Sequence, residues 1–245
     1  MIVALPARAK LNLDLRVIGR RYDGFHDIKT TMQTIELHDL LTIGFVSGET
    51  AMTVSGLNVS DTDNSVLRAH AALERATGKK LPVSMHLDKR IPPGSGLGGA
   101  SSDAAAALIG LKWLFRLDID LSPVAEDVGS DVPFFLRGGT ALVEGRGERV
   151  TSLPTTPAWF AIAWPGIELS TRAVYEAWDE VRGDDLRRAA EHVEPKLRDF
   201  ADSIGDGWRM TGSGSAFFKA TSARKEAEQA VAGLDCWTAV TAVTK

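Results

Sequence analysis

The sequence predicts an α+β fold, and three observations favour it. About the first sixty residues read mostly as strands, and residues 9–17 alternate strictly between apolar and polar side chains. A glycine-rich loop at residues 94–99 then runs into an alanine-rich helix. The second half mixes strands and helices without the steady alternation of a doubly wound sheet. We therefore expect two domains, residues 1–153 and 154–245, joined by the proline-containing segment 154–157.

The composition is ordinary for a globular protein, with 245 residues, 44% of them hydrophobic, and a net charge of −4. The charge offers no basic surface for nucleic acid, and the five scattered histidines show no zinc-binding spacing. The single cysteine, Cys236, excludes an internal disulfide and indicates a reducing compartment. No signal peptide or membrane span is predicted. We expect a cytoplasmic protein without nucleic-acid or membrane partners, either a monomer or a homodimer.

The first half of the chain yields a strand at 9–17, with Leu11 and Val17 on its apolar face and Lys10 and Asn12 on its polar face. We expect the polar face to be open to solvent or substrate. Further elements follow in order: strands at 35–46 and 50–56, a helix at 61–77 with Asp63 or Asn64 as its N-cap, and a strand at 81–91.

The remaining elements follow the glycine loop. A short helix is expected near 121–129, then the segment 130–138, which contains Val132-Pro133, and a hairpin at 139–153. The second half reads, in order, as a strand at 159–165, helical stretches at 171–181 and 185–204, a strand at 208–220, a helix at 222–234 and a strand at 237–244.

The glycine loop matches G-x-G-x-x-G at Gly94, Gly96 and Gly99. A P-loop requires lysine where Ala100 stands, and a Rossmann loop directly follows an apolar strand, whereas Pro92-Pro93 stand here. No motif of a protein kinase follows. What remains is an anion site, formed by the free amides of a helix that begins near Ser101. The alternative is a glycine-rich turn before a capped helix.

Residues 92–105 resemble the phosphate loop of the GHMP kinases, and residues 210–218 resemble their C-terminal glycine motif. The resemblance implies a mixed-sheet N-terminal ATP-binding domain and a ferredoxin-like C-terminal domain. It also implies ATP and Mg²⁺ as cofactors, and Ser102 is a candidate magnesium ligand. The residues that it assigns to the nucleotide are Asn64, Lys89, Pro93, Gly94, Ser95, Gly96, Leu97, Gly98, Gly99, Ala100, Ser101 and Ser102.

Residues 6–13, 23–26, 63–64, 88–92 and 129–135 together resemble one branch of that superfamily. The branch phosphorylates a cytidyl-diphosphate sugar alcohol in the non-mevalonate isoprenoid pathway. The resemblance implies that Asp131 is the catalytic base and Lys10 its partner; the alternative for Asp131 is a helix N-cap before Val132. The residues that it assigns to the substrate are Asn12, Phe25, His26, Thr171, Tyr175, Gly212, Ser213 and Gly214.

Some of the substrate residues also have a structural explanation. Phe25 and His26 are expected to read cytosine, the alternative being a turn aromatic and an ordinary surface histidine. Thr171 is explained nearly as well by a helix N-cap. The chain departs from the branch at Phe25, commonly tyrosine, at Ala100, commonly glycine, and in a shortened segment at 176–208. Two alternatives stay open: another GHMP kinase, of homoserine or mevalonate type, and a catalytically silent nucleotide-binding relative.

Overall fold

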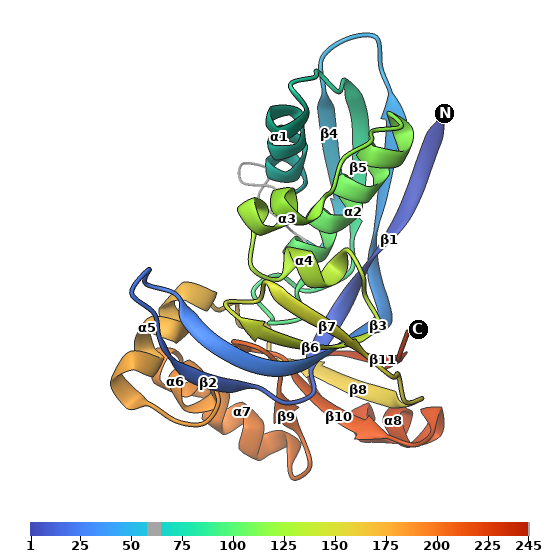
Figure 1. The fold of residues 1–245 in the computed structure, drawn as a ribbon. Coiled ribbons are helices and arrows are strands. Elements are labelled where there is room, and N and C mark those ends of the chain that lie inside the picture. Colours follow the sequence, from blue (N-terminus) through green and yellow to red (C-terminus); the bar gives the residue numbers. More distant parts are fainter. Residues whose placement is uncertain (58–64, 245) are drawn as a thin grey trace. The chain divides into compact units, whose positions relative to one another are not determined.

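The computed structural model describes residues 1–57 and 65–244, which pack as two units (Figure 1). The first unit comprises residues 1–9, 38–91 and 98–137, and the second comprises residues 10–37, 92–97 and 138–245. Two strands, β1 (Ile2–Asn12) and β3 (His26–Phe45), run along the chain from one unit into the other. The predicted domain boundary between residues 153 and 154 stays a prediction.

In the first unit, residues 40–45 of β3 pair antiparallel with β5 (Val83–Lys89), and β4 (Ala51–Gly56) runs parallel to β5. The helices of this unit, visible around α2 in Figure 1, are α1 (Ser65–Thr77), α2 (Gly99–Leu114), α3 (Ser122–Val128) and α4 (Val132–Phe135). Helix α2 is buried on nearly every side because its residues are mostly alanine and leucine. Gly110 lets it approach the strands: a β-carbon there would lie 2.8 Å from Ile43 and 2.9 Å from Leu5.

In the second unit, residues 28–33 of β3 pair with β6 (Thr140–Gly145), which continues into β7 (Arg149–Leu153) as the predicted hairpin. Strand β2 (Arg16–Arg20) pairs with the beginning of β3. A separate antiparallel sheet has the order β11-β8-β10-β9, formed by β8 (Trp159–Trp164), β9 (Arg209–Met210), β10 (Phe217–Thr221) and β11 (Trp237–Ala242).

Four helices complete the second unit: α5 (Thr171–Val181), α6 (Arg187–Val193), α7 (Lys196–Ile204) and α8 (Arg224–Val231). Their apolar faces share one core with β8 and β10, in which Trp178, Leu197 and Phe217 are buried. The stretch predicted as helical at 185–204 is two helices, because Pro195 cannot donate the backbone hydrogen bond that a continuous helix would need.

The strand predicted at 9–17 is instead the end of β1 and the beginning of β2, with a break at residues 13–15. Lys10 and Asn12 are only 3% exposed, whereas we expected their face to be open. The backbone N–H of Lys10 donates to the carbonyl of Leu97 (2.9 Å), and that of Asn12 donates to the hydroxyl of Thr211 (2.9 Å). Loop segments therefore cover this end of β1.

The strand predicted at 208–220 is instead two strands, β9 and β10, which pair antiparallel, because Gly212 and Gly214 turn the chain between them with left-handed backbone. Strand β3 begins at His26, nine residues before the strand predicted at 35–46. The remaining element predictions agree with the structure to within a few residues, and the predicted N-cap at residues 63–64 lies outside the described residues. Across residues 1–57 and 65–244, no helix is both long and apolar enough to span a bilayer.

Candidate active site

Lys10 lies at the centre of a buried cluster in the second unit. Its Nζ donates hydrogen bonds of 2.6 Å to the Oδ1 of Asn12 and 2.6 Å to the carbonyl of Gly96. Asn12 in turn donates from its side-chain amide to the hydroxyl of Thr30 (2.9 Å). The lysine that the sequence assigns to catalysis is thus fixed by two other predicted site residues, one from its own strand and one from the glycine loop.

The second glycine motif packs directly against this cluster. A β-carbon on Gly212, whose φ is +59°, would lie 2.8 Å from the Nζ of Lys10 and 3.1 Å from the carbonyl of Gly96. A β-carbon on Gly96, with φ +78°, would lie 2.3 Å from the carbonyl of Thr211 and 2.9 Å from that of Gly214. Both positions require glycine, because the backbone is left-handed and no room remains for a side chain. The two glycine motifs, far apart in sequence, lie against each other.

The beginning of the glycine loop is fixed by backbone hydrogen bonds within the second unit. Gly94 accepts from the N–H of Leu169 (3.0 Å), and Ser95 accepts through its carbonyl from Ala216 (2.9 Å). The buried hydroxyl of Ser95 donates to the carbonyl of Pro92 (2.6 Å). Ser95 therefore shapes the loop from inside, while Pro93 is partly exposed and the Leu97 side chain lies in the core.

The end of the loop becomes the amino terminus of α2 in the first unit. Helix α2 begins at Gly99, two residues before the predicted start, and Gly98 precedes it with φ +76°. No side chain caps it, so the N–H groups of its first turn are available to an anion. Ala100 is exposed, Ser101 is partly buried and Ser102 is buried. The arrangement suits phosphate oxygens, as the sequence predicted for this loop.

Lys89 takes part in a second buried cluster, in the first unit. Its Nζ lies between two carboxylates, in contact with Asp39 and 2.7 Å from Asp103. Asp39 also accepts the backbone N–H of Ile91 (2.8 Å), so it anchors the segment that leads into the glycine loop. A β-carbon on Gly99 would lie 3.2 Å from the Nζ of Lys89. The ammonium is 5% exposed and binds protein groups, and a nucleotide contact by Lys89 stays a prediction.

Three ionisable groups share this cluster, two acidic and one basic, and burial acts in opposite directions on the pKa of Asp103 and on that of Lys89. Burial raises the pKa of Asp103 to about 7, although the Lys89 ammonium opposes the shift. Burial would lower the pKa of Lys89, but the carboxylates of Asp103 and Asp39 together raise it above its ordinary value. Among the described residues, the Oδ1 of Asp103 is the buried side-chain oxygen or nitrogen without a hydrogen-bond partner. Asp39 and Asp103 were not predicted as functional residues.

The residues predicted to contact cytosine form a third group, in the second unit. His26 is 7% exposed, and its Nε2 lies 3.0 Å from the Oδ1 of Asp179. The ring of Tyr175 stacks on that of His26, with centroids 5.0 Å apart. Phe25 is 47% exposed, and the guanidinium of Arg146 lies 5.3 Å from the centre of its ring. His26 is thus a buried, oriented side chain and not an ordinary surface histidine.

Thr171 and Ser213 also meet in the second unit. Their hydroxyl oxygens are 3.0 Å apart, so helix α5 is linked to the second glycine motif. The N-cap of α5 is Ser170, whose side chain accepts from the N–H of Ala173 (3.4 Å). Capping therefore does not explain Thr171, because the preceding serine does it.

Asp131 occupies the N-cap position of α4 in the first unit, but its side chain makes no capping hydrogen bond. It is partly exposed. The alternative explanation of Asp131 as a helix cap is therefore not supported by a hydrogen bond, and a chemical role stays a prediction. Asn64, predicted to border the nucleotide, lies outside the described residues.

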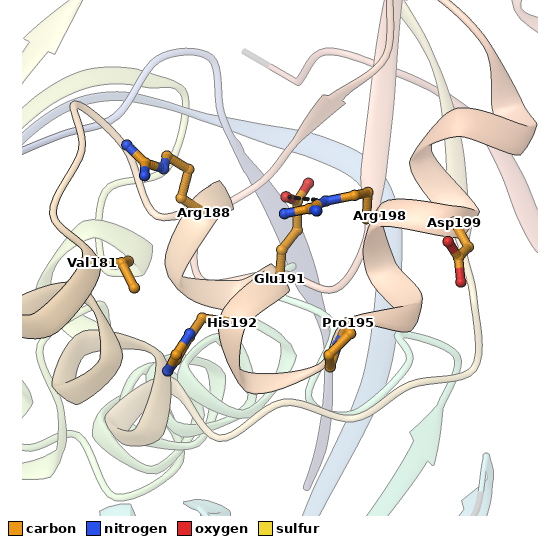
Figure 2. A pocket seen from close by; sticks show the side chains of 7 residues that line it. All are labelled: Val181, Arg188, Glu191, His192, Pro195, Arg198 and Asp199. Carbon is orange, nitrogen blue, oxygen red and sulfur yellow. Dashed lines mark hydrogen bonds and ion pairs between the residues drawn. The ribbon is translucent and has the colours of Figure 1, made fainter.

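Figure 2 shows a groove of about 500 Å³ over α6 and α7, within the segment 176–208 that was predicted to be shortened. Its walls are mostly charged, and the charges are largely paired: Glu191 accepts from Arg187 (2.8 Å) and Arg198 (3.5 Å). None of the predicted site residues lines it. Across the described ranges, no group of three acidic, histidine or cysteine side chains is arranged to hold a metal ion.

Comparisons with known proteins agree with this geometry. Residues 64–139 match the family model of the GHMP kinases N terminal domain. A 4-diphosphocytidyl-2-C-methyl-D-erythritol kinase of Thermotoga maritima is 38% identical over 246 residues, covering 87% of this chain and 90% of the relative. One of Shewanella sp. is 34% identical, covering 94% and 88%. The chain belongs to the 4-diphosphocytidyl-2-C-methyl-D-erythritol kinase family.

Some matches within the family are shorter. The relative from Caldicellulosiruptor bescii is 42% identical over 181 residues, which is 71% of this chain and 63% of the relative. For Caldicellulosiruptor saccharolyticus the chain likewise spans 62% of the relative's length.

Solved structures confirm the fold class. The crystal structure of a 4-(cytidine 5'-diphospho)-2C-methyl-D-erythritol kinase superposes with a TM-score of 0.86 at 31% identity, covering 99% of this chain and 100% of the other. A homoserine kinase from Cytophaga hutchinsonii superposes with a TM-score of 0.70 at 16% identity, covering 99% and 94%. At that identity the second match shows the fold alone. The predicted two-domain α+β GHMP kinase fold is therefore confirmed.

Proposed function

We propose that this protein transfers the γ-phosphoryl group of ATP to the 2-hydroxyl of 4-diphosphocytidyl-2-C-methyl-D-erythritol, in non-mevalonate isoprenoid biosynthesis. The products are the 2-phosphate and ADP. The observation that carries the proposal is the cluster at Lys10, where the first strand, the phosphate loop and the second glycine motif meet. Family membership supports the choice of substrate.

The phosphates of ATP would bind at the amino terminus of α2. Its first N–H groups lack a side-chain cap, and the helix dipole favours negative charge there. The left-handed glycines before it allow the backbone to approach the phosphate oxygens closely. Ser101 and Ser102 add hydroxyl donors.

Mg²⁺ would be held together with the nucleotide, with the hydroxyl of Ser101 or Ser102 as the candidate protein ligand. Such ions are commonly held by substrate phosphates and only one or two protein ligands, so a cage of acidic side chains is not required. The ion would supply neutralisation of the charge that develops on the transferring group.

Asp131 is proposed as the base and Lys10 as its partner. A tertiary hydroxyl is a poor nucleophile, and a carboxylate can accept its proton as the bond to phosphorus forms. An ammonium group would stabilise negative charge on the phosphoryl oxygens during transfer. The assignment of the pair rests on the motifs of residues 6–13 and 129–135, since Lys10 belongs to the second unit and Asp131 to the first.

The cytidyl end of the substrate would be recognised by Phe25, His26 and Tyr175. An aromatic ring gains stacking energy from a base, and an imidazole supplies a hydrogen-bonding edge. Asn12, Thr171 and residues 212–214 would orient the alcohol, and the contact between Thr171 and Ser213 would keep their two segments together.

The proposal is tested by ADP release from ATP and Mg²⁺ with 4-diphosphocytidyl-2-C-methyl-D-erythritol, homoserine or mevalonate as acceptor. We expect turnover with the cytidyl substrate alone, and a loss of at least about 100-fold in Asp131→Asn. Asp127→Asn is the control, because Asp127 is an exposed acid paired with Arg75. Turnover with another alcohol would favour a different GHMP kinase, and ATP binding without any turnover would favour a silent relative.

A further inference from the structure

His26 is held by a carboxylate that the sequence did not single out. Its Nε2 lies 3.0 Å from the Oδ1 of Asp179, while the Oδ2 of Asp179 lies 3.2 Å from Arg20. The two side chains of the His26–Asp179 pair are 5% and 18% exposed. The carboxylate is therefore fixed between an arginine and an imidazole, and the bond is shielded from water.

The bond to Asp179 determines which imidazole nitrogen carries the proton. A carboxylate only accepts hydrogen bonds, so the Nε2 of His26 must be the N–H donor. In the neutral ring the Nδ1 then presents a lone pair. Within the described part of the chain this Nδ1 has no hydrogen-bond partner, so it is the ring nitrogen left to pair with a ligand.

Two aromatic rings prevent the imidazole from turning. Tyr175 stacks on it at an interplanar angle of 28°, and Trp178 meets it edge-on with centroids 5.6 Å apart. Tyr175, Trp178 and Asp179 all come from α5, with Trp178 and Asp179 three and four residues after Tyr175, so one face of one helix supplies these three groups.

We infer that Asp179 is a positioning residue, which keeps the proton of His26 on Nε2 so that Nδ1 accepts a hydrogen bond from the 4-amino group of cytosine. Uracil carries a carbonyl oxygen at the same position, and two acceptors would then face each other. A site built to pair with one polar group discriminates strongly against an analogue that leaves the pair unmade. The inference rests on the proposed function, because it concerns how the same site chooses its nucleobase.

The first test compares kcat/KM for the cytidyl substrate and its uridyl analogue in wild type and Asp179→Asn. An asparagine amide either accepts from Nε2 or donates to it, so the proton position is no longer fixed. We expect the cytidyl preference to fall about tenfold or more, through KM for the cytidyl substrate, with kcat little changed. Glu176→Gln is the matched control, an exposed acid on the same helix paired with Arg172. An unchanged preference in Asp179→Asn would overturn the inference.

The second test needs no turnover. In protein labelled with ¹⁵N-histidine, the imidazole resonances of His26 should show the tautomer protonated on Nε2 in wild type and a mixture in Asp179→Asn. Arg20→Gln removes the arginine that holds Asp179 but keeps the carboxylate, so it should shift the tautomer of His26 less than Asp179→Asn does. It replaces Asp179→Asn if that variant does not fold. A wild-type ring protonated on Nδ1 alone would overturn the inference. If the wild type shows no turnover, the proposed function fails. The tautomer of His26 and the relative affinities for CDP and UDP then still decide this inference.

Discussion

Lys10 and Lys89 are both almost completely buried, 3% and 5% exposed, yet their surroundings differ. Lys10 donates to an amide oxygen and a backbone carbonyl, in the second unit. Lys89 is bound by the carboxylates of Asp39 and Asp103, in the first unit. Burial alone therefore does not determine the role of a lysine. The Lys89 cluster balances charge and anchors a segment, whereas the Lys10 cluster joins three segments that we propose to bind ATP and substrate.

The largest expected effect on stability is that of Lys89→Met. Removing the ammonium leaves two buried carboxylates unpaired, which should lower the free energy of unfolding by about 3–5 kcal/mol. Lys112→Met is the control within the same unit, because the Nζ of Lys112 donates to the neutral carbonyl of Ile119 (2.6 Å). It should cost about 1 kcal/mol. If both variants lose the same free energy of unfolding in urea denaturation, charged and neutral partners of a buried lysine do not differ in their effect on stability.

Gly96→Ala should be the next most damaging substitution. The left-handed backbone costs an alanine about 1–2 kcal/mol, and the clash of its β-carbon with the carbonyl of Thr211 should add about 1–3 kcal/mol. Gly166→Ala is the matched control, because the φ of Gly166 (+76°) is similar to that of Gly96 and nothing lies within 4 Å of the added β-carbon. If both variants lose the same stability, the two glycine motifs are not packed as described.

Lys10→Met should cost less stability than Lys89→Met, about 1–3 kcal/mol, because the hydrogen bonds of Lys10 to Asn12 and Gly96 are made to neutral acceptors. Its effect on turnover should be much larger than its effect on stability. Measuring both thermal unfolding and ADP release for this variant distinguishes its effect on stability from its effect on turnover. A stability loss as great as that of Lys89→Met would show that Lys10, too, is chiefly a structural residue.

The pH dependence of stability should sharpen the account of the Lys89 cluster. Burial raises the pKa of Asp103 from its ordinary 3.8 to about 7, so between these values the folded state binds more protons than the unfolded state. The contribution of Asp103 is therefore fully present below about pH 4 and is lost as pH rises toward 7, by up to about 1.4 kcal/mol per pH unit. Asp103→Asn should flatten this fall, and Asp127→Asn should not.

Much of the site could be predicted because its motifs are local in sequence. Gly94 and Gly96 have left-handed backbone, and at Gly99 a β-carbon would lie 3.1 Å from Ile91, so these requirements are visible in the sequence as a glycine pattern. Lys10 and Asn12 were identified by their motif, but their exposure was predicted wrongly. Alternation indicates that two faces differ, and it does not reveal that loops from distant residues cover the polar one.

The supporting residues were not predicted, for a physical reason. Asp39, Thr30 and Asp179 act through contacts between segments far apart in the chain, and a single acid or hydroxyl in a strand or helix carries no local signal of such a partner. Asp179 could have been suspected from its spacing, since it follows Tyr175 by one helical turn. The start of α2 at Gly99 instead of near Ser101 reflects the glycine loop passing directly into the helix.

The most direct test of this account measures ADP release with 4-diphosphocytidyl-2-C-methyl-D-erythritol, together with the free energy of unfolding, in wild type and Lys10→Met. The account predicts turnover in wild type and a loss of at least about 100-fold in a variant that remains folded. Undiminished turnover in Lys10→Met, or no turnover in wild type, would contradict it.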